Sequence, residues 1–103
     1  MKEEDFLKQV IELAHLCGWL IFHARPAMTS KGWRTPVQAD GAGFPDLVLV
    51  RERVIFAELK SEKGKLSDTQ KVWRDAILAA DGEYYTWKPS EWDDVVDKVS
   101  KVV

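Results

Sequence analysis

Three ionisable side chains border two apolar segments in the middle of the chain. Asp46 begins the apolar run 46–50, and Glu58 and Lys60 lie at the end of the run 54–60. Because side chains alternate along a strand, Glu58 and Lys60 project from the same face. A charged group on an apolar strand costs free energy, so this combination indicates chemistry rather than packing.

Only a short turn around Glu52 separates the two runs, which predicts a β-hairpin. Counting outward from this turn places Asp46 opposite Glu58, and directly opposed Cβ atoms lie ~4.5–5.5 Å apart. Two carboxylates at that distance repel each other. A divalent cation would resolve the conflict, because Mg²⁺ is held by one or two carboxylates together with waters and phosphate oxygens. The main-chain carbonyl of Leu59 is available as a further ligand.

Lys60 can orient or help deprotonate an attacking water, and its charge can offset the charge that builds on a phosphate. We therefore interpret Asp46, Glu58 and Lys60 as a catalytic centre for phosphodiester hydrolysis. Two simpler interpretations compete: Asp46 as a turn residue after Pro45, and Glu58 with Lys60 as a charge pair that protects an edge strand. The three residues together, and the apolar length of the second run, favour the catalytic interpretation.

The surrounding sequence predicts a mixed sheet with helices on its faces. Apolar residues at helical spacing predict helices over 3–17 and 67–80, and a last helix after residue 90. Strands are predicted over 19–24, 46–50, 54–60 and 83–87, with a long polar loop over 25–44. The run 46–50 lacks alternation, which is typical of a strand covered on both faces. For the helix over 67–80 we expect a core face of Val72, Trp73, Ala76, Ile77 and Ala80.

The composition predicts one globular domain over residues 1–103. No apolar run approaches the ~20 residues of a membrane span, and the acidic start is unlike a signal peptide. The single cysteine, Cys17, excludes an internal disulfide, which favours a cytoplasmic protein. His15 and His23 have no second ligand at metal-binding spacing.

Four segments of the chain together resemble the VRR-NUC family of the PD-(D/E)XK nuclease superfamily. The resemblance spans essentially the whole chain. Its most specific part is the Pro-Asp pair that begins one strand, followed by the Glu-x-Lys that ends the next. The segments are Gly43-Phe44-Pro45-Asp46-Leu47-Val48, Phe56-Ala57-Glu58-Leu59-Lys60-Ser61, Gln70-x-x-Trp73 and Trp87-Lys88-Pro89-Ser90.

This resemblance implies a restriction-endonuclease-like αβββαβ core, a mixed sheet flanked by helices, with an additional C-terminal helix. It also implies Mg²⁺- or Mn²⁺-dependent cleavage of DNA, in branched or flapped forms such as Holliday junctions. Stand-alone proteins of this size resemble phage-encoded or bacterial homodimers, and a symmetric dimer would give a short chain enough surface for branched DNA. The turn 51–53 lacks the glycine common in relatives.

Members of the superfamily also place a carboxylate on the first helix. Glu3 is our choice for this position, because it shares a helical face with Val10 and Ala14. Glu4 lies toward the flank of that face, and Glu12 points away. We expect Glu3 to assist the metal.

Gln70 has two interpretations, which are compatible with each other. Ser67 and Gln70 fit a helix capping box, in which each side chain bonds the backbone of the other residue. The family resemblance instead places this glutamine beside the active site, where it helps to orient water or phosphate.

The net charge of −2 argues against a protein that only coats nucleic acid, but positive charge gathers in the central half of the chain. Lys63 and Lys65, next to the catalytic strand, and Lys31 and Arg34, in the long loop, are candidate DNA contacts. Ordinary solvated side chains are an equally good interpretation of all four.

Two other classes of function compete with a nuclease. The first is a module that binds DNA junctions without cutting, which would have no need of the repelling pair Asp46 and Glu58. The second is a sheet-edge interaction protein with no role on nucleic acid, whose stability would not respond to Mg²⁺ or Mn²⁺.

Overall fold

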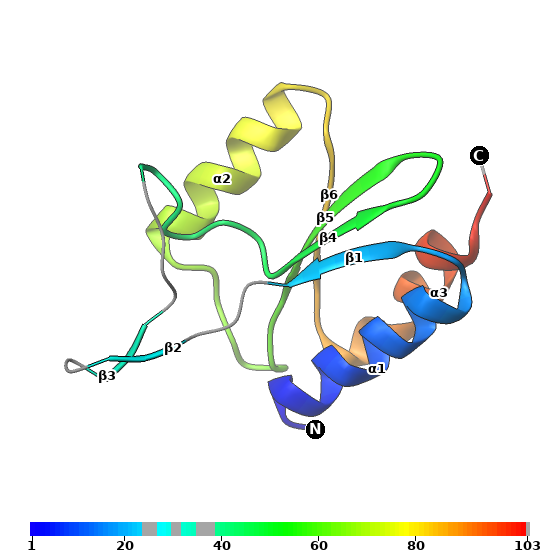
Figure 1. Cartoon of the computed structure of the whole chain (residues 1–103), viewed down its shortest axis with the longest axis horizontal. Coiled ribbons are helices and arrows are strands. Elements are labelled where there is room, and N and C mark those ends of the chain that lie inside the picture. Colours follow the sequence, from blue (N-terminus) through cyan, green and yellow to red (C-terminus); the bar gives the residue numbers. More distant parts are fainter. Residues whose placement is uncertain (24–26, 30–31, 35–38, 103) are drawn as a thin grey trace.

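A four-stranded mixed sheet lies between two helical layers (Figure 1). The computed structural model describes residues 1–23, 27–29, 32–34 and 39–102. The strand order is β1 (Leu20–His23), β4 (Leu47–Val50), β5 (Val54–Leu59) and β6 (Glu83–Trp87). Helices α1 (Glu3–Leu16) and α3 (Trp92–Ser100) pack on one face, α2 (Asp68–Ala79) lies on the other, and a short 3₁₀ helix, η1 (Pro89–Glu91), precedes α3. The predicted α/β fold, with its C-terminal helix, is confirmed.

The pairing of the strands follows from the lengths of their connections. A short turn joins β4 to β5, and these strands pair antiparallel with Leu47 opposite Ala57 and Val50 opposite Val54. The much longer connection from β5 to β6 contains α2, so these strands run parallel, as a crossover through a helix allows. β1 pairs antiparallel with β4 and forms one edge of the sheet.

The main core lies between the sheet and the helices α1 and α3. Alternate residues of β4 and β5 point into it, as the two-residue repeat of a strand requires. Three positions one turn apart on α1 face them, and two positions on α3 complete the contact. The fully buried apolar members of these elements are Phe6, Val10, Ala14, Leu47, Leu49, Ile55, Ala57, Leu59, Val95 and Val99.

The opposite face of the sheet is only partly covered, which corrects two expectations. Val50 is 39% exposed, so the strand over 46–50 is not covered on both faces. On α2 only Ile77 is buried, whereas Val72 is 67% exposed. The apolar face of α2 is wider than the strip that reaches the sheet, so Val72, Ala76 and Ala80 are not core residues.

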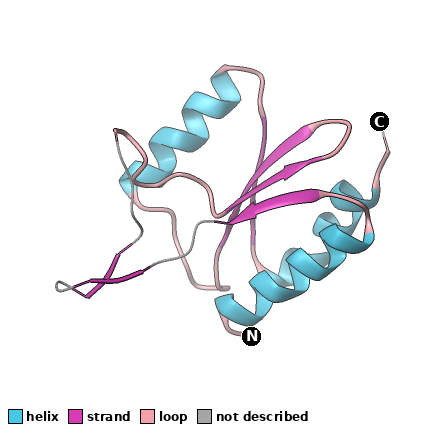
Figure 2. Ribbon diagram, in the orientation of Figure 1, coloured by secondary structure: helices cyan, strands magenta, loops and turns pink. Residues whose placement is uncertain are grey.

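The long connection after β1 contains a second, two-stranded sheet, where the sequence predicted only a loop. β2 (Ala27–Thr29) pairs antiparallel with β3 (Gly32–Arg34). This hairpin projects away from the main sheet (Figure 2). Among the described residues each of these strands pairs only with the other. Three residues are too few to show the apolar alternation by which a core strand is recognised.

Two arginines hold the β4–β5 turn in place. The guanidinium of Arg51 lies 4.4 Å from the centre of the Trp19 ring, and that of Arg53 lies 5.0 Å from it. Arg51 also donates to the carbonyl of Cys17 at 2.8 Å, and Arg53 donates to that of Lys101 at 3.0 Å. The turn is thereby fixed to the carboxyl ends of α1 and α3, and these two charges serve the fold.

Candidate active site

The two candidate metal-binding carboxylates come from adjacent strands. Asp46 directly precedes β4, and the register that pairs Leu47 with Ala57 continues to place Asp46 opposite Glu58. The Oδ2 atom of Asp46 accepts a hydrogen bond from the Leu59 amide at 2.9 Å. One oxygen of Asp46 is therefore held by the backbone of β5, which fixes the direction of its carboxylate.

Glu58 is the one charged residue buried in the part of the chain that the structure describes, with 2% of its surface exposed. The pKa of Glu58 is raised from 4.5 to about 9, and burial is the largest cause. A hydrogen bond to Asp46 and the charge of Asp46 act in the same direction. The charge of Lys60 acts in the opposite direction. Without a cation, Glu58 therefore holds its proton at neutral pH.

Gln70 combines both of the roles considered from the sequence. Its side-chain Oε1 accepts from the Ser67 amide at 2.8 Å, and its own amide donates to the Ser67 hydroxyl at 3.2 Å, so the capping box is present. Its Nε2 donates to Oε1 of Glu58 at 3.3 Å. The cap of α2 thus carries a polar side chain directly onto the buried carboxylate.

Lys60 and Leu59 follow Glu58 at the end of β5. The Lys60 amide donates to the carbonyl of Trp87 at 2.9 Å, which extends the parallel ladder by one step and fixes the backbone here. Lys60 is half-buried, whereas the Leu59 side chain points from the other face of the strand into the main core. Strand alternation therefore places Lys60 on the same face as Glu58.

Glu3 lies in the first turn of α1, near enough for its charge to raise the pKa of Glu58. The buried face of α1 is centred on Phe6, Val10 and Ala14, and Glu3 stands three residues before the first of them. Within the described residues, no group of three or more Asp, Glu, His or Cys side chains is arranged to hold a metal ion. Glu3 is thus a neighbour of the carboxylate pair rather than part of a three-carboxylate cluster.

The donor set at this site fits a hard divalent cation. Asp46 and Glu58 supply two carboxylates and Leu59 can supply a carbonyl oxygen, which is the kind of set that Mg²⁺ uses with additional waters. A cation there would also favour the ionised form of Glu58, against the burial and the charge of Asp46 that raise its pKa.

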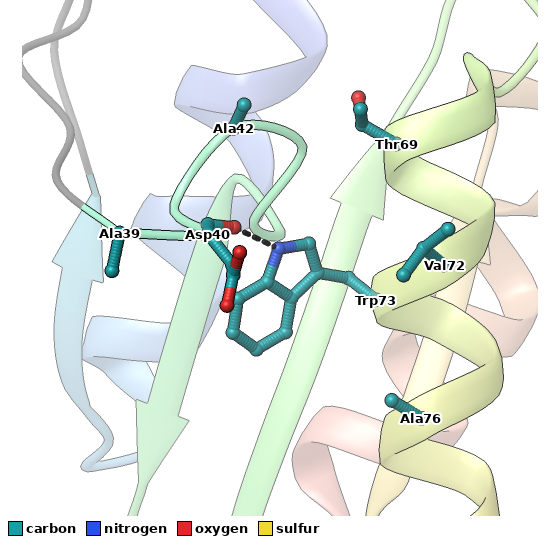
Figure 3. Close-up of a pocket in the computed structure, with 7 residues that line it drawn as sticks. All are labelled: Ala39, Asp40, Ala42, Thr69, Val72, Trp73 and Ala76. Carbon is teal, nitrogen blue, oxygen red and sulfur yellow. Dashed lines mark hydrogen bonds between the residues drawn. The ribbon is translucent and has the colours of Figure 1, made fainter.

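The loop before Asp46 is fastened to α2 by close contacts (Figure 3). The Trp73 indole N–H donates to the carbonyl of Asp40 at 2.8 Å. Phe44 packs edge-on against Trp73, with ring centres 5.0 Å apart. At Gly43, which has a φ of +84°, a Cβ would lie 2.5 Å from the carbonyl carbon of Thr69, so only glycine fits. These contacts fix the chain that delivers Asp46 to the site.

The candidate DNA contacts do not gather at one place. Lys65 lines a groove that also contains Lys60, and Lys63 is exposed in the same loop. Arg34 belongs to β3 of the projecting hairpin, and Lys31 lies outside the residues that the structure describes.

Tyr84 is a residue of this site that the sequence analysis missed. It is buried, and its hydroxyl accepts from the Thr86 hydroxyl at 3.1 Å. Burial raises the pKa of Tyr84, and the negative charges of Glu58 and Asp46 raise it further. Alternation along 83–87 indicates that Tyr84 and Thr86 share a face, but only the pairing of β6 with β5 brings that face to Glu58.

A mixed α/β sheet that presents two carboxylates and a lysine at the ends of adjacent strands defines a nuclease-like protein. The family description "VRR-NUC domain" matches residues 7–88, and the chain belongs to this family. No curated protein matches the chain. Membership of the VRR-NUC family gives the chain the function of a nuclease acting on DNA. No helix of the described residues is both long and apolar enough to cross a membrane.

Proposed function

We propose that this protein is a Mg²⁺- or Mn²⁺-dependent endonuclease that hydrolyses phosphodiester bonds in branched or flapped DNA. The observation that carries this proposal is the buried Glu58, which is held against the carboxylate of Asp46. Such a pair lowers the stability of a protein that lacks a cation, so its presence is best explained by the binding of one.

Each residue of the site has a distinct part in the proposed reaction. Asp46, Glu58 and the Leu59 carbonyl would hold the cation, which when bound supplies positive charge to the phosphate and lowers the pKa of water. Lys60 orients the attacking water and offsets charge on the phosphate oxygens. Gln70 holds Glu58 in place through the bond at 3.3 Å. Glu3 assists by adding negative charge that attracts the cation.

A cleavage assay tests this proposal directly. Labelled linear, single-stranded, flapped and four-way-junction DNA would be incubated with Mg²⁺, Mn²⁺ or EDTA. We expect metal-dependent cutting by the wild type, fastest on a branched form, and a loss of about 10²–10⁴-fold in rate for Lys60→Ala. Asp46→Ala should lose cutting as well. Lys8→Ala removes an exposed lysine of α1 that has no part in the assigned site, so this matched control should cut normally.

The competing binding module makes the opposite prediction. Junction binding without cutting, in every metal and by every variant, would refute the nuclease and favour that module. Cutting that continues at the wild-type rate in Lys60→Ala or Asp46→Ala would refute the assigned site.

We also propose that two copies of the chain form a symmetric dimer. The edge strand β1 exposes Leu20 (75%) and Phe22 (56%), and the neighbouring Val50 and Val54 on the same face are 39% and 42% exposed. A second copy would cover this apolar strip and present two active sites to a branched DNA. Size-exclusion chromatography with light scattering should give a dimer at micromolar concentration, and a strict monomer would refute this proposal.

A further inference from the structure

A groove beside the active site collects positive charge from four separate parts of the chain. Its volume is about 440 Å³. Lys60 enters it from the end of β5, Lys65 from the following loop, Lys71 and Arg74 from α2, and Lys88 from the end of β6. Among the residues that the structure describes, no carboxylate and no aromatic ring lines it, although the whole chain carries a net charge of −2.

The cations of this groove are available to a ligand. Across residues 1–23 and 39–102, no carboxylate lies within 4.0 Å of the ammonium groups of Lys65, Lys71 or Lys88. Arg74 pairs with Asp75 through its Nε atom at 2.9 Å, and a guanidinium has four further N–H donors. By contrast, Arg51 and Arg53 are occupied by backbone carbonyls and by Trp19.

The groove is continuous with the candidate catalytic centre. Lys60, two residues from Glu58, lines its near end. Thr86 also lines the groove, and it lies opposite Glu58 in the register of β5 and β6. Its hydroxyl donates to Tyr84, whose pKa is affected by the charges of Glu58 and Asp46. A row of phosphate groups that extends away from the carboxylate pair would therefore pass along the groove.

We propose that this groove binds the sugar-phosphate backbone of the DNA strand being cut, at phosphates adjacent to the scissile one. Lys71, Arg74 and Lys88 are then DNA-binding residues, in addition to Lys65. The inference rests on the proposed nuclease function and specifies how its substrate is held. The described lining has cationic donors and neither an aromatic ring nor an acidic side chain, so it suits phosphates rather than bases. The contact is therefore independent of the base sequence of the DNA.

The test is the salt dependence of DNA binding by the full chain in EDTA, where no cutting occurs. Fluorescence anisotropy would measure affinity for a labelled duplex at several salt concentrations. Each phosphate contact contributes about 0.9 to the slope of log K against log[salt]. Lys71→Gln with Lys88→Gln should therefore bind more weakly and reduce the slope by about 1.8. The double variant Lys71→Arg with Lys88→Arg keeps both charges and should retain the wild-type slope.

The matched control is Lys8→Gln with Lys101→Gln, which removes two exposed lysines outside the groove. This control should leave the slope unchanged. An equal fall in slope for the control and for the groove variant would overturn the proposal, since the effect would then reflect total charge. So would an unchanged slope in the groove variant.

Methylphosphonate substrates locate the contact along the strand. A neutral methylphosphonate next to the cut site should weaken wild-type binding and have little further effect on the groove variant. Equal weakening of both proteins at every neighbouring position would place the lysines elsewhere and overturn the proposal. If the wild type binds and cuts DNA but any of these contrary results is found, only the groove proposal is refuted. If the wild type cuts no DNA at all, the proposed function itself is refuted.

Discussion

Replacing Glu58 by glutamine should stabilise the metal-free protein at neutral and alkaline pH. The pKa of Glu58 is raised from 4.5 to about 9 in the folded chain. Below pH 4.5 the carboxyl is protonated in both the folded and the unfolded chain, and its contribution to stability is greatest. As the pH rises toward 9, the unfolded chain gains the free energy of ionisation that the folded chain forgoes, so stability falls.

The magnitude follows from the width of that pH window. One pKa unit corresponds to about 1.36 kcal/mol, so the three units between 4.5 and pH 7.5 set an upper limit of about 4 kcal/mol. The hydrogen bond to Asp46 and the charge of Asp46 contribute to this shift, so replacing Glu58 alone recovers only part of the limit. We therefore expect Glu58→Gln to raise the free energy of unfolding by about 1–3 kcal/mol. The glutamine can still accept from Gln70 and can donate to Asp46, so little packing is lost.

The assay is thermal unfolding in EDTA at pH 5 and pH 8. A gain of 1 kcal/mol should raise Tm by roughly 4–8 °C in a domain of this size. Glu58→Gln should exceed the wild type at pH 8 and come close to it at pH 5, whereas the exposed Glu12→Gln should match the wild type at both. An equal difference at the two pH values, or a wild type that is more stable than Glu58→Gln at pH 8, would refute the reasoning.

Three further predictions follow from the same contacts. Mn²⁺ binding should release about one proton from Glu58 at neutral pH. Calorimetry in buffers of different ionisation enthalpy would detect this release, and a release of zero would contradict the raised pKa of Glu58. Gly43→Ala should lower the free energy of unfolding by about 1–3 kcal/mol more than Gly18→Ala does. Both glycines have a φ of +84°, but only Gly43 lies against Thr69. Equal losses of stability in urea unfolding would disprove this steric cause. Arg51→Met should lower the free energy of unfolding by about 1–2 kcal/mol through loss of its ring contact and hydrogen bond, and an unchanged urea midpoint would show that they contribute nothing.

The amino-acid sequence determined the arrangement of the central hairpin and of the residues on it. Asp46 lies opposite Glu58 because a short turn joins their strands, and the count of residues on each side sets the register. Glu58 and Lys60 share a face because strands alternate. The capping box at Ser67 and Gln70 was also predictable, since it depends on residues three apart. In each case the signal is local, so tertiary packing had little to add.

Tertiary structure decided which residues from distant parts of the chain join that hairpin. β6 pairs with β5 only after the crossover through α2, and this pairing brings Tyr84, Thr86 and Lys88 beside the catalytic strand. No local pattern encodes such a pairing, because the free energy of a long-range contact depends on how the whole connection packs. For the same reason the sequence could not reveal that α2 leaves Val72 exposed. Apolar periodicity shows which face of a helix is apolar, whereas the width of that face in contact with the sheet is set by how the two elements are placed.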